Sequence, residues 1–414
     1  MKQAEHNSAG GGWQADPRNE YDAPVATKRI GMGLVGAGFV GPHHVDAVRR
    51  LGYVDIVAVA GSSAQSARAK ADALHVERAY GSYQELLDDP RVQVVHNATP
   101  NYLHYEVNAA AIAKGKHVVS DKPLAMTAAE GKSLLEQARR AGIVHAVTFN
   151  YRGNPIVQHA KTAIARGDIG KPRFVHGHYL QDWLIKDTDY SWRLEPDKGG
   201  ASSALGDIGS HWCDLAQHVS GLRITHVLGD LTTSIPKRKR PKAKGSREAF
   251  QAAGGEETEL VDITVEDLAS VLIRFDGGAK GAFSVGQVCA GHKNDVQLEV
   301  CGATASMRWR QEEQNELWIG HRDAANQVLA KDPSLLDPAA RPYAHLPGGH
   351  QEAWADAFCN LMRDIYGFIA EGKPADAPKP PAFATFEDGY RANCIVEAIL
   401  KSSQGGGVWT QVNY

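Results

Sequence analysis

The chain has 414 residues, a formal net charge of -3 and 22% charged residues. This length favours two domains over a single core. The charge excludes the strongly basic composition expected of a protein that binds nucleic acid or an acidic membrane surface. Five scattered cysteines form no C-x-x-C pair, which predicts reduced thiols in the cytoplasm and neither a disulfide framework nor a structural zinc site. No run reaches the roughly 18 to 20 apolar residues of a membrane span, so we expect a soluble protein with no membrane partner.

The first 27 residues are polar and contain several glycines. They lack the apolar segment of a secretion signal. We therefore expect residues 1–27 to form a disordered leader, to which the sequence assigns no role.

A glycine-rich turn follows the first apolar run, Ile30–Val35. Gly36, Gly38 and Gly41 stand at G-x-G-x-x-G spacing before an expected helix. Such glycines permit a tight turn, close approach of backbone N–H groups to a pyrophosphate, and close packing of helix on strand. The same turn also occurs without a ligand, but a second apolar run at residues 53–60 completes a βαβ unit and favours a dinucleotide site. The predicted contacts in this turn are Gly36, Gly38, Phe39, Val40 and Gly41.

From residue 28 to 152, short β-branched runs alternate with helical stretches such as 64–74 and 128–141. This alternation predicts an α/β domain with a parallel, doubly wound Rossmann sheet. Ligands of such sheets lie beyond the carboxyl ends of the strands, so the segments after each strand are the candidate binding segments.

The segment after the second expected strand is Gly61-Ser62-Ser63. It lacks the acidic residue that usually binds the ribose hydroxyl of NAD. Ser62 and Ser63, with Arg68 or Lys70 nearby, could instead accept the 2′-phosphate of NADP. Helix capping by serine is an equally good explanation, so the choice between NAD and NADP stays open with a slight preference for NADP.

Two further segments follow expected strands on the nicotinamide side of the crevice. The first is Thr99-Pro100-Asn101 with His104, and the second is Asp121-Lys122-Pro123. A single lysine is usually a solvated charge, but its position at a strand end makes Lys122 a candidate. The predicted cofactor contacts in these segments are Thr99, Pro100, Asn101, His104, Asp121 and Lys122.

The second half of the chain contains a helix expected from residue 207 to 219. Asp207 and His211 lie on one stripe of this helix, next to an apolar stripe, and the stripe contains no Lys or Glu. We therefore expect it to face a cleft. A helix cap with an interior histidine is the simpler alternative. A shared metal ion is disfavoured because Lys122 would compete with it and no third ligand is evident, so we predict no metal here.

Long β-type runs then predict a C-terminal α+β domain, residues 153–414, built on a large, open, mainly antiparallel sheet. A polar loop is expected at 236–259, including a basic run at 237–244 that is either solvated or contacts a phosphate or a partner. A terminal helix is expected at 386–401. The expected strands are 224–233, 264–275, 281–288, 296–300, 306–310 and 316–319.

These motifs, taken together, resemble the glucose-fructose oxidoreductase, inositol dehydrogenase and MocA family. The resemblance rests on the glycine turn, Thr99-Pro100-Asn101 with His104, Asp121-Lys122-Pro123, Tyr151-Arg152 and Gly206-Asp207-Ile208-Gly209-Ser210-His211. It implies hydride exchange between NAD(P) and a sugar or cyclitol carbon. It also implies a homodimer or homotetramer that assembles through the open sheet. Asp121 departs from the pattern, because the family usually has the longer Glu before Lys-Pro.

The chemistry assigns roles to these residues. A neutral histidine suits proton removal from an alcohol near neutral pH, so His211 is the candidate base. By resemblance, Lys122 donates to the same oxygen, and Asp207 binds a substrate hydroxyl or holds the lysine and histidine. The residues expected to line a polyhydroxylated ligand are Tyr151, Arg152, Asp182, Trp183, Asp207 and His211. Two alternatives remain open: glycoside hydrolysis through transient oxidation, and a non-enzymatic NADP-binding sensor.

Overall fold

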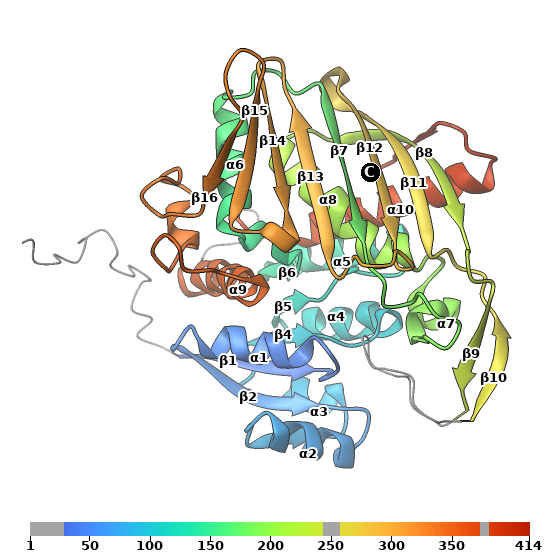
Figure 1. Cartoon of the computed structure of the whole chain (residues 1–414). Helices are drawn as coiled ribbons and strands as arrows, with labels where there is room; N and C mark the ends of the chain where they lie inside the picture. The colour runs from blue at the N-terminus through green and yellow to red at the C-terminus, as the bar shows by residue number, and fades with distance from the viewer. Residues whose placement is uncertain (1–28, 243–256, 373–380) are drawn as a thin grey trace, which may run out of the picture.

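The computed structural model describes residues 29–242, 257–372 and 381–414. The expected leader at 1–27 lies outside these residues, and so does the middle of the expected loop, 243–256. Two sheets organise the described chain, one in each half (Figure 1).

The first sheet has six parallel strands in the order β3-β2-β1-β4-β5-β6. This order confirms the predicted doubly wound Rossmann fold. Strand order reverses between β1 and β4, the point at which such sheets bind ligands. The strands are β1 (Ile30–Val35), β2 (Val54–Ala60), β3 (Arg78–Tyr80), β4 (Val94–Asn97), β5 (His117–Ser120) and β6 (His145–Val147). The helices between them are α1 (Gly41–Arg49), α2 (Ala64–Ala73), α3 (Tyr83–Asp88), α4 (His104–Ala113) and α5 (Ala128–Ala141).

Both faces of this sheet are covered by helices, as a parallel sheet requires. Apolar side chains of α3, α4 and α5 pack on one face. On the other face, α1 and α2 share the core with α9 (Trp354–Ala370), which comes from near the end of the chain (Figure 1). Phe358, Met362 and Tyr366 of α9 are buried there. The sequence placed α9 in the C-terminal domain, but its packing completes the N-terminal core.

The second sheet has nine strands in the order β16-β15-β14-β13-β7-β12-β11-β8-β17. Only the pair β7–β12 is parallel, so the sheet is mainly antiparallel, as predicted. The strands are β7 (Phe174–Leu180), β8 (Ile224–Thr232), β11 (Leu268–Phe275), β12 (Lys280–Gly286), β13 (Asp295–Cys301), β14 (Ala305–Arg310), β15 (Glu316–His321), β16 (Gln327–Ala330) and β17 (Thr410–Gln411).

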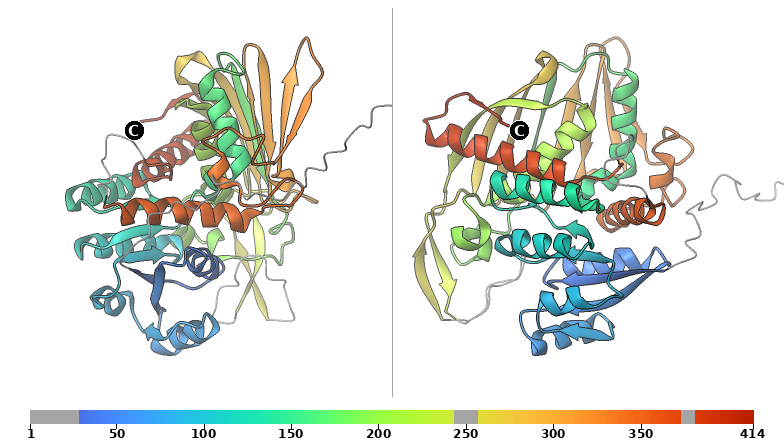
Figure 2. Two further views of the ribbon diagram at one scale, coloured as in Figure 1. Left: turned by 90° about the vertical axis from the view of Figure 1, so that its left-hand side faces the viewer. Right: turned by 180° about the vertical axis from the view of Figure 1, so that it is seen from behind.

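Helices cover only one face of this second sheet in the part of the chain that the structure describes (Figure 2). These helices are α6 (Pro155–Arg166), α8 (Ser210–Ser220) and α10 (Phe386–Gln404). Odd-numbered residues of β7, such as Val175 and Tyr179, point into the core beneath them, whereas the even-numbered residues Phe174, His176 and His178 point to the open face. We refer to the uncovered side as the open face.

The ends of the expected loop at 236–259 are not irregular. Strands β9 (Lys237–Pro241) and β10 (Thr258–Asp262) pair as an antiparallel ribbon. Lys237 lies opposite Asp262 and Arg240 opposite Glu259, and both pairs form salt bridges. The prediction of a loop over these residues was therefore wrong, because the basic run gains stability from acidic partners across the ribbon. Arg238, which is fully buried, donates to the carbonyls of Leu184, Lys186 and Asp189.

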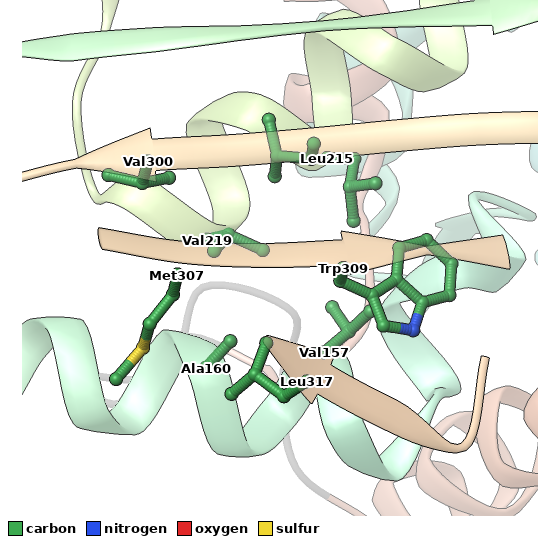
Figure 3. Close-up of a pocket in the computed structure, with 9 residues that line it drawn as sticks. Val157, Ala160, Leu215, Val219, Val300, Met307, Trp309 and Leu317 are labelled. Carbon is green, nitrogen blue, oxygen red and sulfur yellow. The ribbon is translucent and has the colours of Figure 1, made fainter. Parts of the chain in front are cut away.

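A small void lies in the core beneath the second sheet (Figure 3). Its volume is about 10 Å³, and apolar side chains of α6, α8 and the sheet line it. An apolar space of this size holds at most a single water and offers it few hydrogen-bond partners. It is a packing defect and not a substrate site. None of the described helices is both long enough and apolar enough to cross a membrane.

Candidate active site

A short π-helix, Leu205–Gly209, carries Asp207 into the space between the two domains and continues directly into α8. The carboxylate of Glu266 fixes the start of this turn, because Oε1 accepts from the backbone N–H of Ser203 at 3.0 Å and of Leu205 at 2.8 Å. The hydroxyl of Ser202 donates to the same oxygen at 2.8 Å. Isolated π-turns occur mostly at functional sites. The sequence predicted an ordinary α-helix from residue 207, and the wider turn was not foreseen.

Asp207 is bound by side chains from both domains. The Lys122 ammonium donates to Oδ1 at 2.6 Å and to the backbone carbonyl of Asp207 at 2.9 Å. Gln287 donates to Oδ2 at 2.9 Å, and Arg193 Nε lies 3.3 Å from Oδ1. Burial alone would raise the pKa of this carboxyl, but Lys122 and Arg193 hold the pKa of Asp207 well below its usual range. Asp207 is therefore an anion that fixes the position of the Lys122 ammonium.

His211 lies one helical turn after Asp207 and is buried among the rings of Phe149, Tyr151 and Tyr179. Burial, followed by the nearby Lys122 ammonium, lowers the pKa of His211 to about 3. Its Nδ1 has no hydrogen-bond partner among the described residues. The imidazole is consequently neutral at physiological pH and able to accept a proton. Lys122, Asp207 and His211, which the sequence predicted as one group, influence each other electrostatically in the structure.

A chain of hydrogen bonds runs along one side of this group. The hydroxyls of Tyr151 and Tyr179 are 2.8 Å apart, and Tyr179 donates to Asn294 Oδ1 at 2.6 Å. Gln181 Nε2 donates to the same oxygen at 3.1 Å, and Trp183 Nε1 donates to Gln181 Oε1 at 2.9 Å. Burial raises the pKa of Tyr151 to about 12, so its phenol stays neutral. These groups give the site neutral donors and acceptors.

The glycine turn has the shape that a dinucleotide needs. Gly36 has φ +82°, and a Cβ there would lie 2.7 Å from the carbonyl oxygen of Ala98, so only glycine fits. A Cβ at Gly38 would meet no atom within 4 Å, which leaves open space in front of the loop. Helix α1 has no side-chain cap at Val40. Pro42 has no N–H group and the N–H of His43 donates to the carbonyl of Val40, so the N–H of Gly41 is the one that this end of the helix offers to a phosphate. Phe39 is exposed at this turn, and Gly41 is buried at the start of α1.

The serines after β2 do not form a cationic phosphate site with Arg68. Ser63 caps α2 by accepting from the N–H of Ser66 at 3.2 Å, whereas Ser62 is exposed. Arg68 donates to Asp72 at 2.9 Å and to the carbonyls of Glu77 at 2.7 Å and Val76 at 2.9 Å. The capping explanation is therefore confirmed for Ser63, and the guanidinium of Arg68 is already engaged.

The segments after β4 and β5 lie next to each other, joined by His104. Its two ring nitrogens lie 2.8 Å from the carbonyl of Thr99 and 2.6 Å from that of Pro123. The buried His104 thus holds the two segments together through both ring nitrogens. Asn101 donates to the carbonyl of Gly199 at 2.9 Å, and Asp121 accepts from the Thr148 hydroxyl. Pro100 precedes the short 3-10 turn at Asn101–Leu103.

Two residues expected to line the substrate, Arg152 and Asp182, have charged partners within the protein. Arg152 donates from Nε to Asp214 at 2.9 Å and also pairs with Asp388 at 3.1 Å. Its guanidinium therefore belongs to a buried ion cluster. Asp182 accepts from Lys293 at 2.6 Å and from the N–H of Gly291 at 3.2 Å, which fastens the segment after β7 to the loop before β13. Sequence reasoning could not foresee these partners, because they lie far away along the chain.

The structure also brings in residues that sequence reasoning missed. Gln287 and Arg193 contact Asp207, and Asn294 connects Tyr151 to Tyr179. One signal was available for Gln287, a polar and fully buried residue at the end of the apolar run of β12. Arg193 lies in the short 3-10 turn Trp192–Leu194 and Asn294 in the loop before β13, and periodicity gives no information in such short segments.

Fold and site together define a class: two-domain oxidoreductases with an NAD-binding Rossmann domain and a lysine held at the domain junction. Two family models match the chain, one described as "Oxidoreductase family, NAD-binding Rossmann fold" over residues 30–149 and one as "GFO/IDH/MocA C-terminal domain" over residues 157–308. The chain therefore belongs to the Gfo/Idh/MocA oxidoreductase family, as its motifs indicated.

Individual relatives agree with this assignment. Levoglucosan dehydrogenase of Pseudarthrobacter phenanthrenivorans is 31% identical over 390 residues, which cover 91% of this chain and 96% of that protein. The structure of a levoglucosan dehydrogenase in complex with NADH and levoglucosan is 29% identical, with a TM-score of 0.82 over 94% of this chain and 100% of that one. An oxidoreductase domain protein from Kribbella flavida gives the same TM-score at 31% identity and the same coverage of both chains.

Proposed function

We propose that this protein is an NAD-dependent dehydrogenase that oxidises a secondary alcohol of a neutral sugar, anhydrosugar or cyclitol. The observation that carries this proposal is a lysine ammonium held 2.6 Å from Asp207 beside a buried, neutral histidine. Such an arrangement offers one hydrogen-bond donor and one proton acceptor to a single alcohol group.

The residues of this chain then act as follows. Lys122 donates to the hydroxyl oxygen of the substrate and stabilises the alkoxide as it forms. His211 accepts the hydroxyl proton, because its imidazole is neutral at pH values above about 3 and its Nδ1 has no hydrogen-bond partner among the described residues. Asp207 keeps the ammonium in place, and Gln287 and Arg193 keep Asp207 in place. When bound, NAD supplies the hydride acceptor for the carbinol carbon. The turn from Gly36 to Gly41 and the start of α1 would hold its pyrophosphate.

The charges around the site favour an uncharged substrate. Arg193 is paired with Asp207, Lys198 with Glu195, and Lys293 with Asp182. A phosphate or carboxylate on the sugar would have to break one of these pairs before it gained a cation. The hydroxyls and amides of Tyr151, Tyr179 and Asn294 match the hydroxyls of a polyol instead. Levoglucosan, the compound for which one of the relatives is named, is a neutral sugar of this kind.

The engaged state of Arg68 supports NAD over NADP. Its side chain donates to Asp72 and to the backbone carbonyls of Val76 and Glu77, so the guanidinium would have to leave these partners to meet a 2′-phosphate. We expect the ratio of kcat/KM for NAD to that for NADP to exceed about 10, and the variant Arg68→Gln to leave this ratio within about two-fold. A preference for NADP that disappears in Arg68→Gln would overturn this part of the proposal.

The function itself is tested by a panel assay of NADH formation. The panel contains levoglucosan, other anhydrosugars, pentoses, hexoses and inositols, together with their phosphates and acids. We expect net NADH from at least one neutral compound and slower turnover of its phosphorylated form. Glycoside cleavage without net NADH would support the hydrolase alternative. Binding of NAD without either reaction would support the sensor alternative.

The open face supports assembly of identical chains. Phe174 and Leu272 are exposed there, beside a hollow of about 470 Å³ that β7, β8, β11 and β12 line. We expect a homodimer or homotetramer that buries this face, and Leu272→Lys should shift the mass in sedimentation equilibrium toward the monomer. An unchanged mass would contradict assembly through this face.

A further inference from the structure

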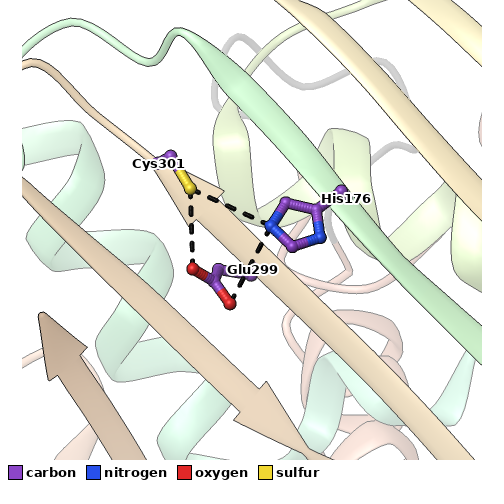
Figure 4. A group of neighbouring side chains, drawn as sticks. All are labelled: His176, Glu299 and Cys301. Carbon is purple, nitrogen blue, oxygen red and sulfur yellow. Dashed lines mark hydrogen bonds and ion pairs between the residues drawn. The ribbon is translucent and has the colours of Figure 1, made fainter.

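Three side chains that suit a metal ion meet on the open face, outside the site described above. His176 lies on β7, directly opposite Glu299 on β13, and Cys301 lies two residues further along β13 on the same side. Figure 4 shows the three side chains pointing toward one another. Their ligand atoms all lie within 4.8 Å of one another. The sequence did not reveal this group, because its members come from strands more than 100 residues apart.

The distances within the group are close to those of a tetrahedral zinc site. Cys301 Sγ lies 3.5 Å from Glu299 Oε1 and 4.0 Å from His176 Nε2, and His176 Nε2 lies 3.9 Å from Glu299 Oε2. Zinc bonds of about 2.3 Å to sulfur and about 2.1 Å to nitrogen or oxygen require ligand separations of about 3.4–3.6 Å. The two distances from Glu299 involve different carboxylate oxygens. With one ligand atom from each residue all separations lie within 4.8 Å, so the group needs to contract by at most about 1.4 Å, which side-chain rotation supplies.

Neighbouring groups hold the three proposed ligands in place. The ring of Phe174 stacks on His176 with centroids 4.9 Å apart, and the pairing of β7 with β13 fixes the backbones of all three residues. Glu299 is largely buried, whereas a third of the His176 side chain is exposed. An ion can therefore reach the group from the open face and keep one position for water or another ligand.

We propose that His176, Glu299 and Cys301 bind one thiophilic divalent cation, with Zn²⁺ as the expected ion. A mixed sulfur, nitrogen and oxygen set favours Zn²⁺ over Mg²⁺ and Ca²⁺, which prefer oxygen ligands alone. Cys301 binds as the thiolate, and its proton passes to the solvent. The site is separate from the alcohol site, since His176 and Tyr179 stand three residues apart on β7 and point to opposite faces of the sheet.

Arg308 is the group that opposes metal binding. Its Nη1 lies 3.9 Å from Glu299 Oε2, and its guanidinium stacks on Trp318 at 4.7 Å from the ring centroid. A positive charge this close to a ligand of the site repels a bound cation. The variant Arg308→Gln should therefore bind the metal about 5-fold more tightly or better.

The experiment uses the full chain, supplied with Zn²⁺ during growth as well as after purification, so that a site enclosed on assembly is also loaded. We expect about one zinc per chain after dialysis. After chelation, Co²⁺ should restore the thiolate-to-cobalt charge-transfer band and the strong visible absorption of a tetrahedral site. Zn²⁺ should also raise the melting temperature of the wild type.

Cys301→Ser and His176→Gln should each weaken binding more than about 10-fold, and Cys301→Ser should remove the charge-transfer band. Cys289→Ser is the matched control, because Cys289 is likewise a free and partly buried cysteine, and it should change nothing. All of these variants should keep wild-type dehydrogenase activity, which shows that they fold. Failure to retain zinc, cobalt spectra without a sulfur band, or equal binding by Cys301→Ser would overturn the proposal.

Discussion

Two aspartates on one continuous helical segment form ion pairs of different kinds. Asp207 lies in the π-turn and binds Lys122, and each of the two side chains is 15% exposed. Asp214 lies two turns later on α8 and binds Arg152, and there the exposure falls to 4% for Asp214 and 10% for Arg152. The cations hold the pKa of Asp207 well below its usual range, whereas burial raises the pKa of Asp214 to about 6.

The difference separates a functional pair from a structural one. The pair at Asp207 faces the space between the domains, where a substrate hydroxyl can share the ammonium. The pair at Asp214 is closed off by Asp388 of α10 and by Gln158 of α6, whose amide donates to the backbone carbonyl of Arg152. A buried ion pair adds little net stability by itself, but removal of one partner leaves an uncompensated buried charge and destabilises the fold. Each of the two aspartates is followed four residues later by a histidine, His211 or His218. The sequence pattern is therefore the same for both, and only the surroundings distinguish them.

The largest effect is expected from breaking the buried ion pair of Arg152 and Asp214. Arg152→Met should lower the free energy of unfolding by about 3–5 kcal/mol, because it leaves Asp214 buried without its cation. Urea denaturation measures this change. Arg322→Met, at an exposed pair with Asp323, is the control and should cost no more than about 0.5 kcal/mol. A variant of normal stability with lost turnover would instead return Arg152 to the substrate site.

Breaking the ion pair of Lys122 and Asp207 should affect catalysis more than folding. Lys122→Met should lower kcat by about 10² or more, because the developing alkoxide loses its donor. Asp207 keeps Gln287 and Arg193 as partners, so the free energy of unfolding should change little. Steady-state kinetics measure kcat, urea denaturation measures the free energy of unfolding, and NAD titration checks that the cofactor still binds. The exposed Lys171→Met is the control. Turnover within about three-fold of wild type would refute the role of Lys122.

His211, beside the pair of Lys122 and Asp207, should make the stability of the fold depend on pH. The pKa of His211 is about 3 in the folded chain and 6.5 in the unfolded one. Between these values the unfolded chain binds a proton that the folded chain does not, so stability falls as the pH falls. His211→Gln should therefore flatten the slope of unfolding free energy below pH 6.5, by up to about 1.4 kcal/mol per pH unit. The exposed His350→Gln should leave the slope unchanged, and a slope identical in wild type and His211→Gln would contradict the burial argument.

The smallest effect is expected at a residue that acts through Asp207. Gln287→Leu removes one of the donors to this carboxylate and should lower kcat about 10-fold while KM stays within about two-fold. Gln287→Asn, which keeps an amide on a shorter side chain, should recover part of the loss. An increase in KM alone would show that Gln287 binds the substrate directly.

The sequence predicted those parts of the molecule that depend on local pattern. The glycine turn, the parallel sheet, and the group of Lys122, Asp207 and His211 all follow from periodicity, from position after a strand or from family motifs. Periodicity does not show which partner a side chain finds far along the chain. Arg152 lies in a segment expected at the substrate site, but Asp214 binds its guanidinium. The basic strand β9 was taken for a loop because its acidic partner β10 lies across a long connection.

The late helix α9 has a consequence for how the chain is made. Phe358, Met362 and Tyr366 fill the same core as β1 and α1, although some 300 residues separate them along the chain. During synthesis the nucleotide-binding half leaves the ribosome first, yet one side of its sheet stays only partly covered, by α1 and α2, until almost the whole polypeptide has emerged. A chain that stops before Trp354 should therefore expose this apolar side and associate with chaperones, and the Rossmann half should not be a separable, autonomous module.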